Sequence, residues 1–491
     1  MKIACLLFCA LSLSRAALAA NSTPDPSWWN KYQYLLQRGP SASASNSGLT
    51  VGTNVDVSNE CGPQSETYIA LDASNPTVLA GGSNEIFRLP MRGYFSSDGG
   101  GSWSGVDLPL PPSLSGTHDT RFGSDPSLAF DSRGDVFYSY IVVFFGGGNG
   151  VDGTEMAVAR SGDGGKTWPA VTFFSFATGG DHFNDKPMIT VDTGPTSRFR
   201  DRVYVAWDAA SGGSSAGGIR VGASADHGAT FTVTRADGPS GPGQSIAAVP
   251  FVGTNGQLYV AYNGYVAHQI VFNRSLDGGA TWGTAHAIAS QSLGFQALIP
   301  AQSFRGALVY PACDVDRSTG KHRGRLVCSW MDVNSAGNTD IFVSFSDDEG
   351  DSWSTPLSAT DRLGGVDRFN HWLSIDPTTG GVFVSFYDTR NDTTGARRMF
   401  DEFLSVSSDG GQTFAAPNLR VSTASSNEHD CGGVFPCAAI DYGNQTGDYE
   451  GLVAFGGVAH PIWTDSRRNQ QSATGCSSSL MEEVFTAAVN R

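Results

Sequence analysis

The chain has 491 residues, a formal net charge of −16, only 16% charged side chains and 61 glycines. The negative charge argues against a nucleic-acid backbone or an anionic membrane as a partner. Abundant glycine and sparse charge are typical of short strands joined by many turns.

Residues 1–20 predict a secretory signal peptide. Lys2 is its basic start, residues 3–13 form an apolar run too short to span a bilayer, and residues 17–19 are a plausible cleavage site. We find no other stretch in the sequence that suits a membrane span, so we expect a secreted or periplasmic protein. Residues 21–52 then form an N-terminal extension and a Ser/Ala/Gly-rich linker, and residues 53–491 form one folded domain.

An eight-residue motif, S-x-D-x-G-x-[ST]-[WF], occurs six times in the chain. Its Asp accepts hydrogen bonds from the following backbone N–H groups, and its Gly adopts backbone angles that other residues avoid. The terminal aromatic ring anchors the turn in the apolar layer below. Each copy therefore predicts a tight hairpin turn. The copies occupy residues 96–103, 161–168, 224–231, 275–282, 346–353 and 407–414, with Asp98, Asp163, Asp226, Asp277, Asp348 and Asp409.

These copies closely resemble the Asp-box, or BNR repeat, of sialidase-like β-propellers. The resemblance implies a propeller in which the boxes are structural rather than catalytic. A turn of this kind is needed in every blade, whereas a catalytic acid is needed once. Because each box joins a third strand to an outer strand, we expect all six on the rim.

A second repeat is a short apolar strand that occurs seven times, each copy preceded by another apolar strand. The seventh unit has no Asp-box, and the alternation of residues 54–58 suits its missing outer strand, which would close the ring and remove exposed edges. We predict an all-β fold, a β-propeller of four-stranded antiparallel blades, with seven blades preferred over the six of sialidases. The copies begin at Val78, Val136, Val203, Leu258, Leu326, Val382 and Val458.

Six cysteines remain after the signal peptide, and an even number in an exported chain predicts disulfides. Cys313 and Cys328 fall on neighbouring strands of one blade and are placed to pair. The pairing of the other four, Cys61, Cys431, Cys437 and Cys476, stays open. The sequence predicts no cofactor and leaves a structural calcium ion open.

Polar side chains stand where inner strands begin and second strands end, and these strand ends converge on one face of a propeller. Residues 387–390 (YDTR) and 463–467 (WTDSR) are equivalent in adjacent blades. An arginine offers a planar, bidentate donor for a carboxylate, so the pattern favours an acidic sugar. In the alternative, each arginine pairs with the Asp two residues before it. The predicted substrate-binding residues are Arg390, Arg467, Arg121, Arg368, Asp388 and Asp465.

Sialidases use a Tyr nucleophile with a Glu partner and an Asp acid/base, and the residues nearest in type here are the Tyr449–Glu450 pair and Asp125. Asp185 and His371 are further candidates from the same ring of strand ends. Arg88 lies in an FRLP sequence similar to a sialidase motif, but it is too close to the first Asp-box to take that role. Glu66, Lys186, Asp208 and Asp448 occupy the same ring and are not singled out. The candidates are Tyr449, Glu450, Asp125, Asp185 and His371.

The first functional hypothesis is a secreted carbohydrate-active enzyme, a sialidase-like glycoside hydrolase acting on an acidic or decorated glycan. One alternative is a polysaccharide lyase acting on uronic-acid-containing glycan, with His371, His182 and Tyr449 as its base and acid. The other is a propeller that binds a glycan or a protein without turnover.

Overall fold

A computed structural model describes residues 48–60, 63–86, 88–112, 120–145, 151–178, 183–210, 218–238, 244–361, 364–429, 446–467 and 482–491. The predicted signal peptide and most of the N-terminal extension and linker lie outside these residues. So do His182 and four of the six cysteines, Cys61, Cys431, Cys437 and Cys476.

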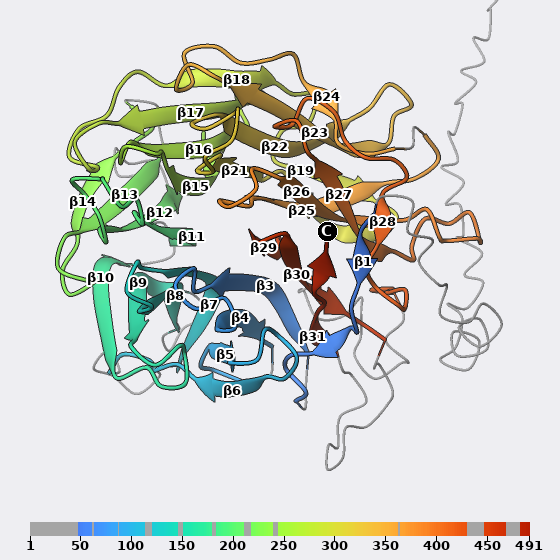
Figure 1. Cartoon of the computed structure of the whole chain (residues 1–491). Coiled ribbons are helices and arrows are strands. Elements are labelled where there is room, and N and C mark those ends of the chain that lie inside the picture. Colours follow the sequence, from blue (N-terminus) through green and yellow to red (C-terminus); the bar gives the residue numbers. More distant parts are fainter. Residues whose placement is uncertain are drawn as a thin grey trace, which may run out of the picture.

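The described residues form seven antiparallel sheets arranged around one axis (Figure 1), which confirms the predicted propeller and its preferred blade number. Inner strands contact the inner strands of both neighbouring sheets, from β3 round to β29 and back to β3. The first three sheets are β3 (Gln64–Leu71), β4 (Leu79–Glu85), β5 (Arg92–Ser96) and β6 (Ser104–Asp107); β7 (Thr120–Phe130), β8 (Val136–Phe145), β9 (Val151–Ser161) and β10 (Ala170–Thr178); β11 (Phe183–Val191), β12 (Val203–Ala210), β13 (Ile219–Ser224) and β14 (Thr232–Arg235).

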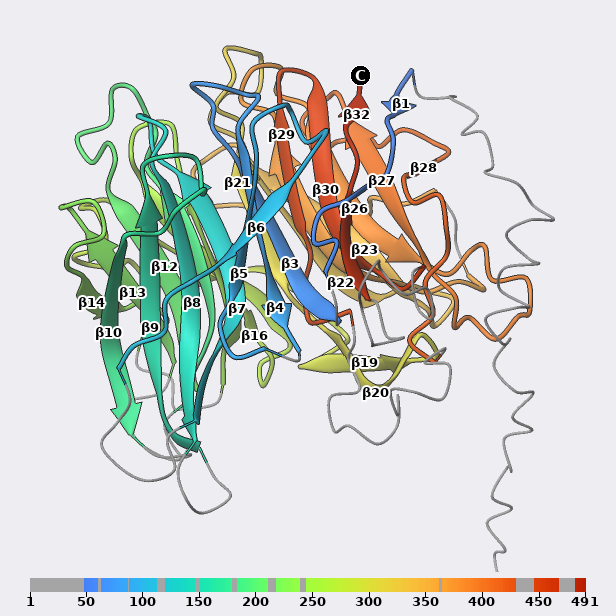
Figure 2. The ribbon, with the colours of Figure 1, turned by 90° about the horizontal axis from the view of Figure 1, so that it is seen from below.

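The next three sheets repeat the same order from the axis to the rim. They are β15 (Ile246–Val252), β16 (Leu258–Gly264), β17 (Gln269–Ser275) and β18 (His286–Ser290); β21 (Pro311–Val315), β22 (Leu326–Val333), β23 (Thr339–Ser346) and β24 (Leu357–Ser358); β25 (Arg368–Ile375), β26 (Val382–Asp388), β27 (Asp401–Ser407) and β28 (Leu419–Arg420). A separate two-stranded hairpin, β19 (Gln296–Ile299) with β20 (Gln302–Leu308), precedes β21 and lies at one end of the ring (Figure 2).

The seventh sheet closes the ring with strands from both ends of the folded chain. It contains β29 (Gly451–Phe455), β30 (Val458–Asp465), β31 (Glu483–Thr486) and β32 (Val489–Asn490). Its outer strands are β2 (Val55–Asp56), which pairs with β31, and β1 (Thr50–Val51), which pairs with β32. The predicted closure by residues 54–58 is therefore confirmed, and pairing begins at Thr50, before the expected domain start at residue 53.

The hydrophobic core lies between neighbouring sheets, because strand side chains alternate between the two faces of each blade. Tyr138 and Leu128 of the second sheet share one buried cluster with Ala80 of the first, and Trp207 of the third shares another with Phe137 of the second. Across the described part of the chain we find no helix with the length and apolarity that a membrane crossing needs.

The six Asp-boxes join third to fourth strands, so they lie on the rim as predicted. In the second sheet, Ser161 Oγ and Thr167 Oγ1 donate to the two carboxylate oxygens of Asp163, at 2.6 and 2.7 Å, and the Thr167 N–H donates at 2.9 Å. Gly164 and Gly165 have φ of 75° and 91°, which explains the glycines. The motif's Trp168 is buried edge-on against Tyr138.

Asp163→Ala is expected to lower the free energy of unfolding by about 1–3 kcal/mol, because it leaves this turn without its acceptor. Chemical denaturation measures the change. Asp152→Ala is the matched control, since Asp152 is exposed on β9, the strand that leads into this turn. Equal stability of the two variants would contradict a stabilising role for the box.

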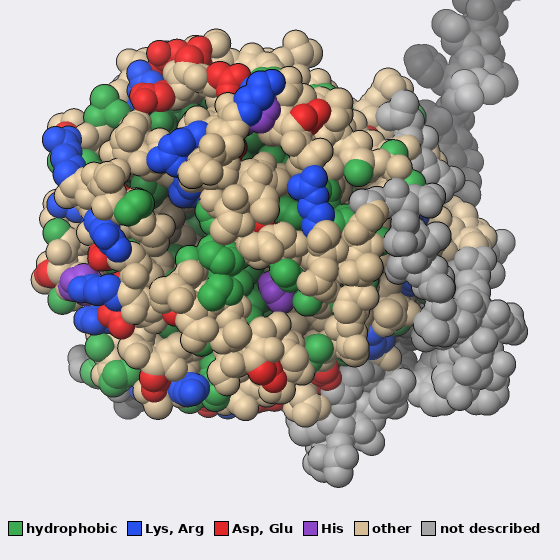
Figure 3. Space-filling model, in the orientation of Figure 1, with side chains coloured by type: hydrophobic (Ala, Val, Ile, Leu, Met, Phe, Trp, Pro, Cys, Tyr) green, Lys and Arg blue, Asp and Glu red, His purple; other side chains and the backbone are tan. Residues whose placement is uncertain are grey.

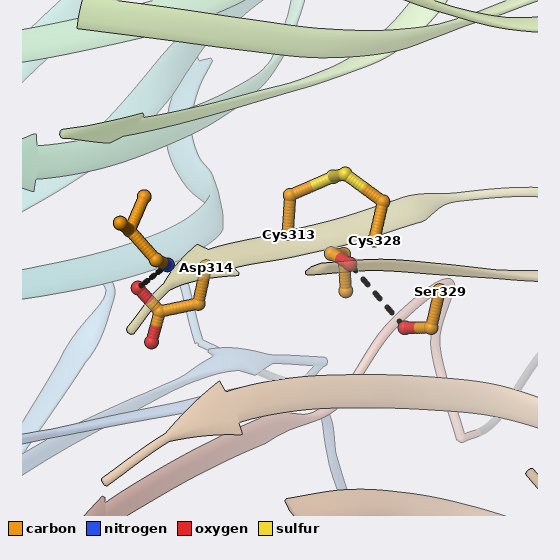
Figure 4. Close-up of a disulfide and its surroundings, with 6 residues drawn as sticks. Cys313, Asp314, Cys328 and Ser329 are labelled. Carbon is orange, nitrogen blue, oxygen red and sulfur yellow. Dashed lines mark hydrogen bonds between the residues drawn. A yellow bond between two sulfur atoms is a disulfide. The ribbon is translucent and has the colours of Figure 1, made fainter. Parts of the chain in front are cut away.

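Cys313 and Cys328 are directly opposite each other on β21 and β22 and form a disulfide (Figure 4). The predicted pairing of these two residues is thus confirmed. Cys313 faces the axial cavity at the end of the ring where the inner strands finish.

Candidate functional site

Several inner strands share a β-bulge near their first residues, and the bulged residue has left-handed backbone angles. Glu66, Asp125, Lys186 and Asn370 have φ of 50°, 61°, 54° and 44°, each at a register shift against the second strand. Such angles are uncommon outside glycine, and bulges often redirect a side chain at a functional site. We call the end of the ring where inner strands begin the acidic face.

Five carboxyl groups gather around one lysine on this face. Lys186 Nζ forms an ion pair with Asp448, and the Lys186 N–H donates to Asp125 at 3.0 Å. Asn84 links two further members, since its Nδ2 donates to Glu66 at 3.0 Å and its Oδ1 accepts from the Asp125 N–H at 2.8 Å. We call this group the axial acidic cluster: Glu66, Asp125, Asp185, Asp208 and Asp448 around Lys186.

The carboxyl groups of the cluster differ in pKa, so that some are proton donors and one is an acceptor. Desolvation, reinforced by the charge of Asp125, raises the pKa of Glu66 well above its ordinary value and that of Asp185 to about 7. Burial acts on Asp125 too, but Lys186 and hydrogen bonds to Asp185 and Glu66 outweigh it and lower its pKa. Asp125 is therefore the ionised acceptor, and Glu66 and Asp185 beside it hold their protons to higher pH than ordinary carboxyls.

Asp185 is the member that a ligand can meet. Asp185 is half-buried as a residue, whereas Glu66, Asp125, Lys186 and Asp448 are each at most 5% exposed. Asp208, its cross-strand neighbour, is fully buried, and burial raises its pKa well above the ordinary value. Asp185 can therefore deliver a proton to a ligand, with ionised Asp125 beside it.

Tyr449 and Glu450, expected to be a nucleophile and its partner, do not form that pair. Tyr449 is 1% exposed, its hydroxyl donates to Pro126 O at 2.9 Å, and burial raises its pKa well above the ordinary value. Both carboxyl oxygens of Glu450 are buried without a hydrogen-bond partner among the described residues, and burial raises its pKa as well. A nucleophilic phenol requires the opposite shift.

His371 is also buried, at 2% exposure. Burial lowers its pKa to about 4, so it is neutral near pH 7. Of the five predicted catalytic residues, the structure brings Asp125 and Asp185 into the cluster and puts the Tyr449 hydroxyl on the backbone of Pro126, the residue after Asp125. The Tyr449 ring contacts Tyr310 and Trp372 at centroid distances of 5.5 and 6.3 Å.

Arg390 and Arg467 occupy equivalent places, as predicted, but they do not reach the axis. Each donates to the Asp two residues before it, Asp388 or Asp465, at 2.7 Å. Each guanidinium also lies over a third-strand phenylalanine, at 4.4 Å for Arg390 and 4.2 Å for Arg467. The structure matches the alternative in which Asp and Arg of this motif pair with each other.

The other predicted substrate-binding arginines have protein partners too. Arg368 is fully buried and bridges Asp340 at 3.0 Å and Asp388 at 2.8 Å. Arg121 donates to Pro111 O at 2.6 Å. Arg88 of the FRLP sequence pairs with Glu60 and Asp107, consistent with no role at the axis.

The cluster residues that were not singled out are Glu66, Lys186, Asp208 and Asp448. The sequence could have indicated them, because each stands where an inner strand begins or a second strand ends, at the equivalent place in its repeat. Among the described residues no group of three or more His, Cys, Asp or Glu side chains is placed to hold a metal ion.

No protein-family model and no curated protein matches this chain. A leech intramolecular trans-sialidase is similar in structure, with 14% identity over 74% of this chain and 71% of that chain and a TM-score of 0.50. The NanB sialidase from Streptococcus pneumoniae (11% identity, 71% and 68% coverage, TM-score 0.47) and a Penicillium chrysogenum α-L-arabinanase (12%, 75% and 92%, 0.43) are also similar. The similarity to the leech enzyme shows that the fold is a sialidase-like β-propeller.

Proposed function

We propose that this protein is an exported glycoside hydrolase in which Asp185 is the general acid and Asp125 its ionised partner. The observation that carries the proposal is the row of buried carboxyls in which Asn84 joins Glu66 to Asp125 and Asp125 accepts from the Lys186 backbone N–H, with half-buried Asp185 next to Lys186. Most glycoside hydrolases cleave the glycosidic bond with two carboxyl groups, one protonated and one ionised. The leech enzyme of the same fold was solved with the sugar 2,7-anhydro-Neu5Ac bound.

The reaction follows from these two protonation states. Asp185 gives its proton to the leaving glycosidic oxygen as the C–O bond breaks, and ionised Asp125 stabilises the positive charge that develops on the sugar. Water then adds to the anomeric carbon, and its released proton restores Asp185. Lys186, held by Asp448, keeps Asp125 ionised and so maintains the difference between the two carboxyls.

We infer a neutral, hydroxyl-rich sugar rather than an acidic one. Asp125 is ionised in the cluster, and a carboxylate accepts hydrogen bonds from sugar hydroxyls but repels a sugar carboxylate. Arg390, Arg467 and Arg368 are held by Asp388, Asp465 and Asp340. A lyase has less support, since neither His371 nor Tyr449 is placed to act as its base or acid.

The test is hydrolysis of matched aryl glycosides, neutral and acidic, by the purified mature chain, followed by the release of nitrophenol. We expect turnover of at least one neutral glycoside and none of a sialoside or glucuronide. Release of sialic acid would overturn the neutral-sugar inference, and an unsaturated uronide would overturn hydrolysis in favour of elimination. Saturable glycan binding without any product would make the propeller a binding protein.

The pH profile of kcat/KM should have a limb that falls above about pH 7. The acid form of Asp185 is the active one and its pKa is about 7, so each further pH unit should remove about tenfold of the activity. The profile is measured from pH 5 to 9 on the best neutral glycoside. A value of kcat/KM that stays constant from pH 6 to 8.5 would exclude Asp185 as the acid.

A further inference from the structure

The opposite end of the ring, where the inner strands finish, has a cavity of about 850 Å³. It is lined by the last residues of inner strands from all seven sheets, from β3 to β29. Figure 3 looks onto this end of the ring and shows hydrophobic side chains gathered at its centre. We call this cavity the funnel.

The funnel is separated from the axial acidic cluster by aromatic rings. Tyr68 and Trp372 meet edge to face at its base with ring centroids 5.4 Å apart, and Trp372 contacts Tyr449 at 6.3 Å. Tyr449 is fully buried and is held by its bond to Pro126. A ligand in the funnel would therefore be distinct from a sugar at the acidic face.

The walls of the funnel are mostly apolar, with Leu128, Ile189 and Leu373 among the lining residues. Asp314, the carboxylate that lines the funnel on β21, already has partners. Asp314 accepts from Arg317 at 2.6 Å and from the Ile375 N–H at 2.9 Å (Figure 4 shows the bond to the backbone). Such walls give water few hydrogen bonds and favour a hydrocarbon chain.

One cation at the mouth of the funnel has no carboxylate partner among the described residues. Arg323 is exposed, and its Nη1 donates to the backbone oxygens of Arg317 and Ser318, at 2.8 and 3.1 Å. Arg317, also in the lining, is by contrast paired with Asp314. The two carbonyl bonds fix the Arg323 guanidinium at the rim and leave its other N–H groups for an anion.

We propose that the funnel binds a long-chain fatty acid, with the hydrocarbon chain against the apolar walls and the carboxylate on Arg323. The volume lies within the usual range for small-molecule sites. The occupant is the free acid rather than a lipid in a bilayer, because the apolar walls are the inner strands that line a cavity and not an outer surface that a bilayer could cover. The proposal is independent of the chemistry at the acidic face.

The test is a fluorescence titration of the mature chain with a dansyl-labelled undecanoate, followed by its displacement with dodecanoate or dodecanol. Arg323→Gln should weaken dodecanoate binding about ten- to a hundredfold and leave dodecanol unchanged. Arg198→Gln, at an exposed arginine outside the cavity lining, is the matched control and should change neither. Thr190→Trp, which fills the cavity from β11, should abolish the binding of both.

Each remaining outcome contradicts part of the proposal. Absence of saturable binding to the wild-type chain would overturn it altogether. Probe binding that survives Thr190→Trp, in a variant whose melting temperature shows that it is folded, would place the ligand elsewhere. If Arg323→Gln weakened the binding of dodecanoate and of dodecanol equally, Arg323 would not be the contact of the carboxylate.

Discussion

Asp185→Asn is expected to lower kcat on a neutral glycoside about 10²- to 10⁴-fold, the range that general acid catalysis supplies. An asparagine keeps the shape of the side chain but has no proton to give to the leaving oxygen. The expectation rests on two features of Asp185, its partial exposure and its pKa of about 7. Binding of the sugar should change much less than turnover, so the loss should appear in kcat rather than KM.

The leaving group provides the decisive control for this variant. A dinitrophenolate leaves without being protonated, so Asp185→Asn should affect a dinitrophenyl glycoside far less than a methyl glycoside of the same sugar. Asp163→Asn, on the rim, is the matched variant that should leave both rates unchanged in folded protein. Equal losses on the two substrates would mean that Asp185 positions the cluster and is not the acid.

Repetition made most of the fold predictable from the sequence. Six Asp-boxes fixed the turns between third and fourth strands, and seven apolar strands indicated the number of sheets. Closure by Val55–Asp56 followed from one alternating segment, because a ring with an unpaired edge would leave backbone groups exposed. Such periodic patterns can be recognised in a single sequence, because every copy supports the others.

The candidate site was only half predictable, because register does not determine where a side chain points. Asp125 and Asp185 stand at strand ends that converge, and they meet. Arg390 stands at an equally suitable strand end, but it folds back over Phe403 onto its own Asp388. The β-bulges add a second obstacle, since a one-residue shift moves a side chain to the other face of a strand. Glu66 carries no sequence signal of that shift.

Arg368→Met tests the same distinction between a ligand contact and a structural ion pair. We expect it to lower the free energy of unfolding by about 3–5 kcal/mol, because removing one partner leaves buried charges uncompensated. Arg368, Asp340 and Asp388 are all fully buried, and Asp388 retains Arg390, whereas no other cation among the described residues pairs with Asp340. Denaturant unfolding measures the loss, and Arg198→Met, at an exposed position, should stay within about 0.5 kcal/mol of the wild type.

Adding Asp340→Asn to Arg368→Met should restore at least about 1 kcal/mol, since the second substitution removes the charge that the first one left unpaired. This recovery separates an ion pair from a simple packing defect, which a second polar substitution would only worsen. Sugar binding by the folded fraction of Arg368→Met should be unchanged. If the variant were instead as stable as the wild type but lost affinity for a glycan, Arg368 would contact the ligand and the preference for a neutral sugar would fail with it.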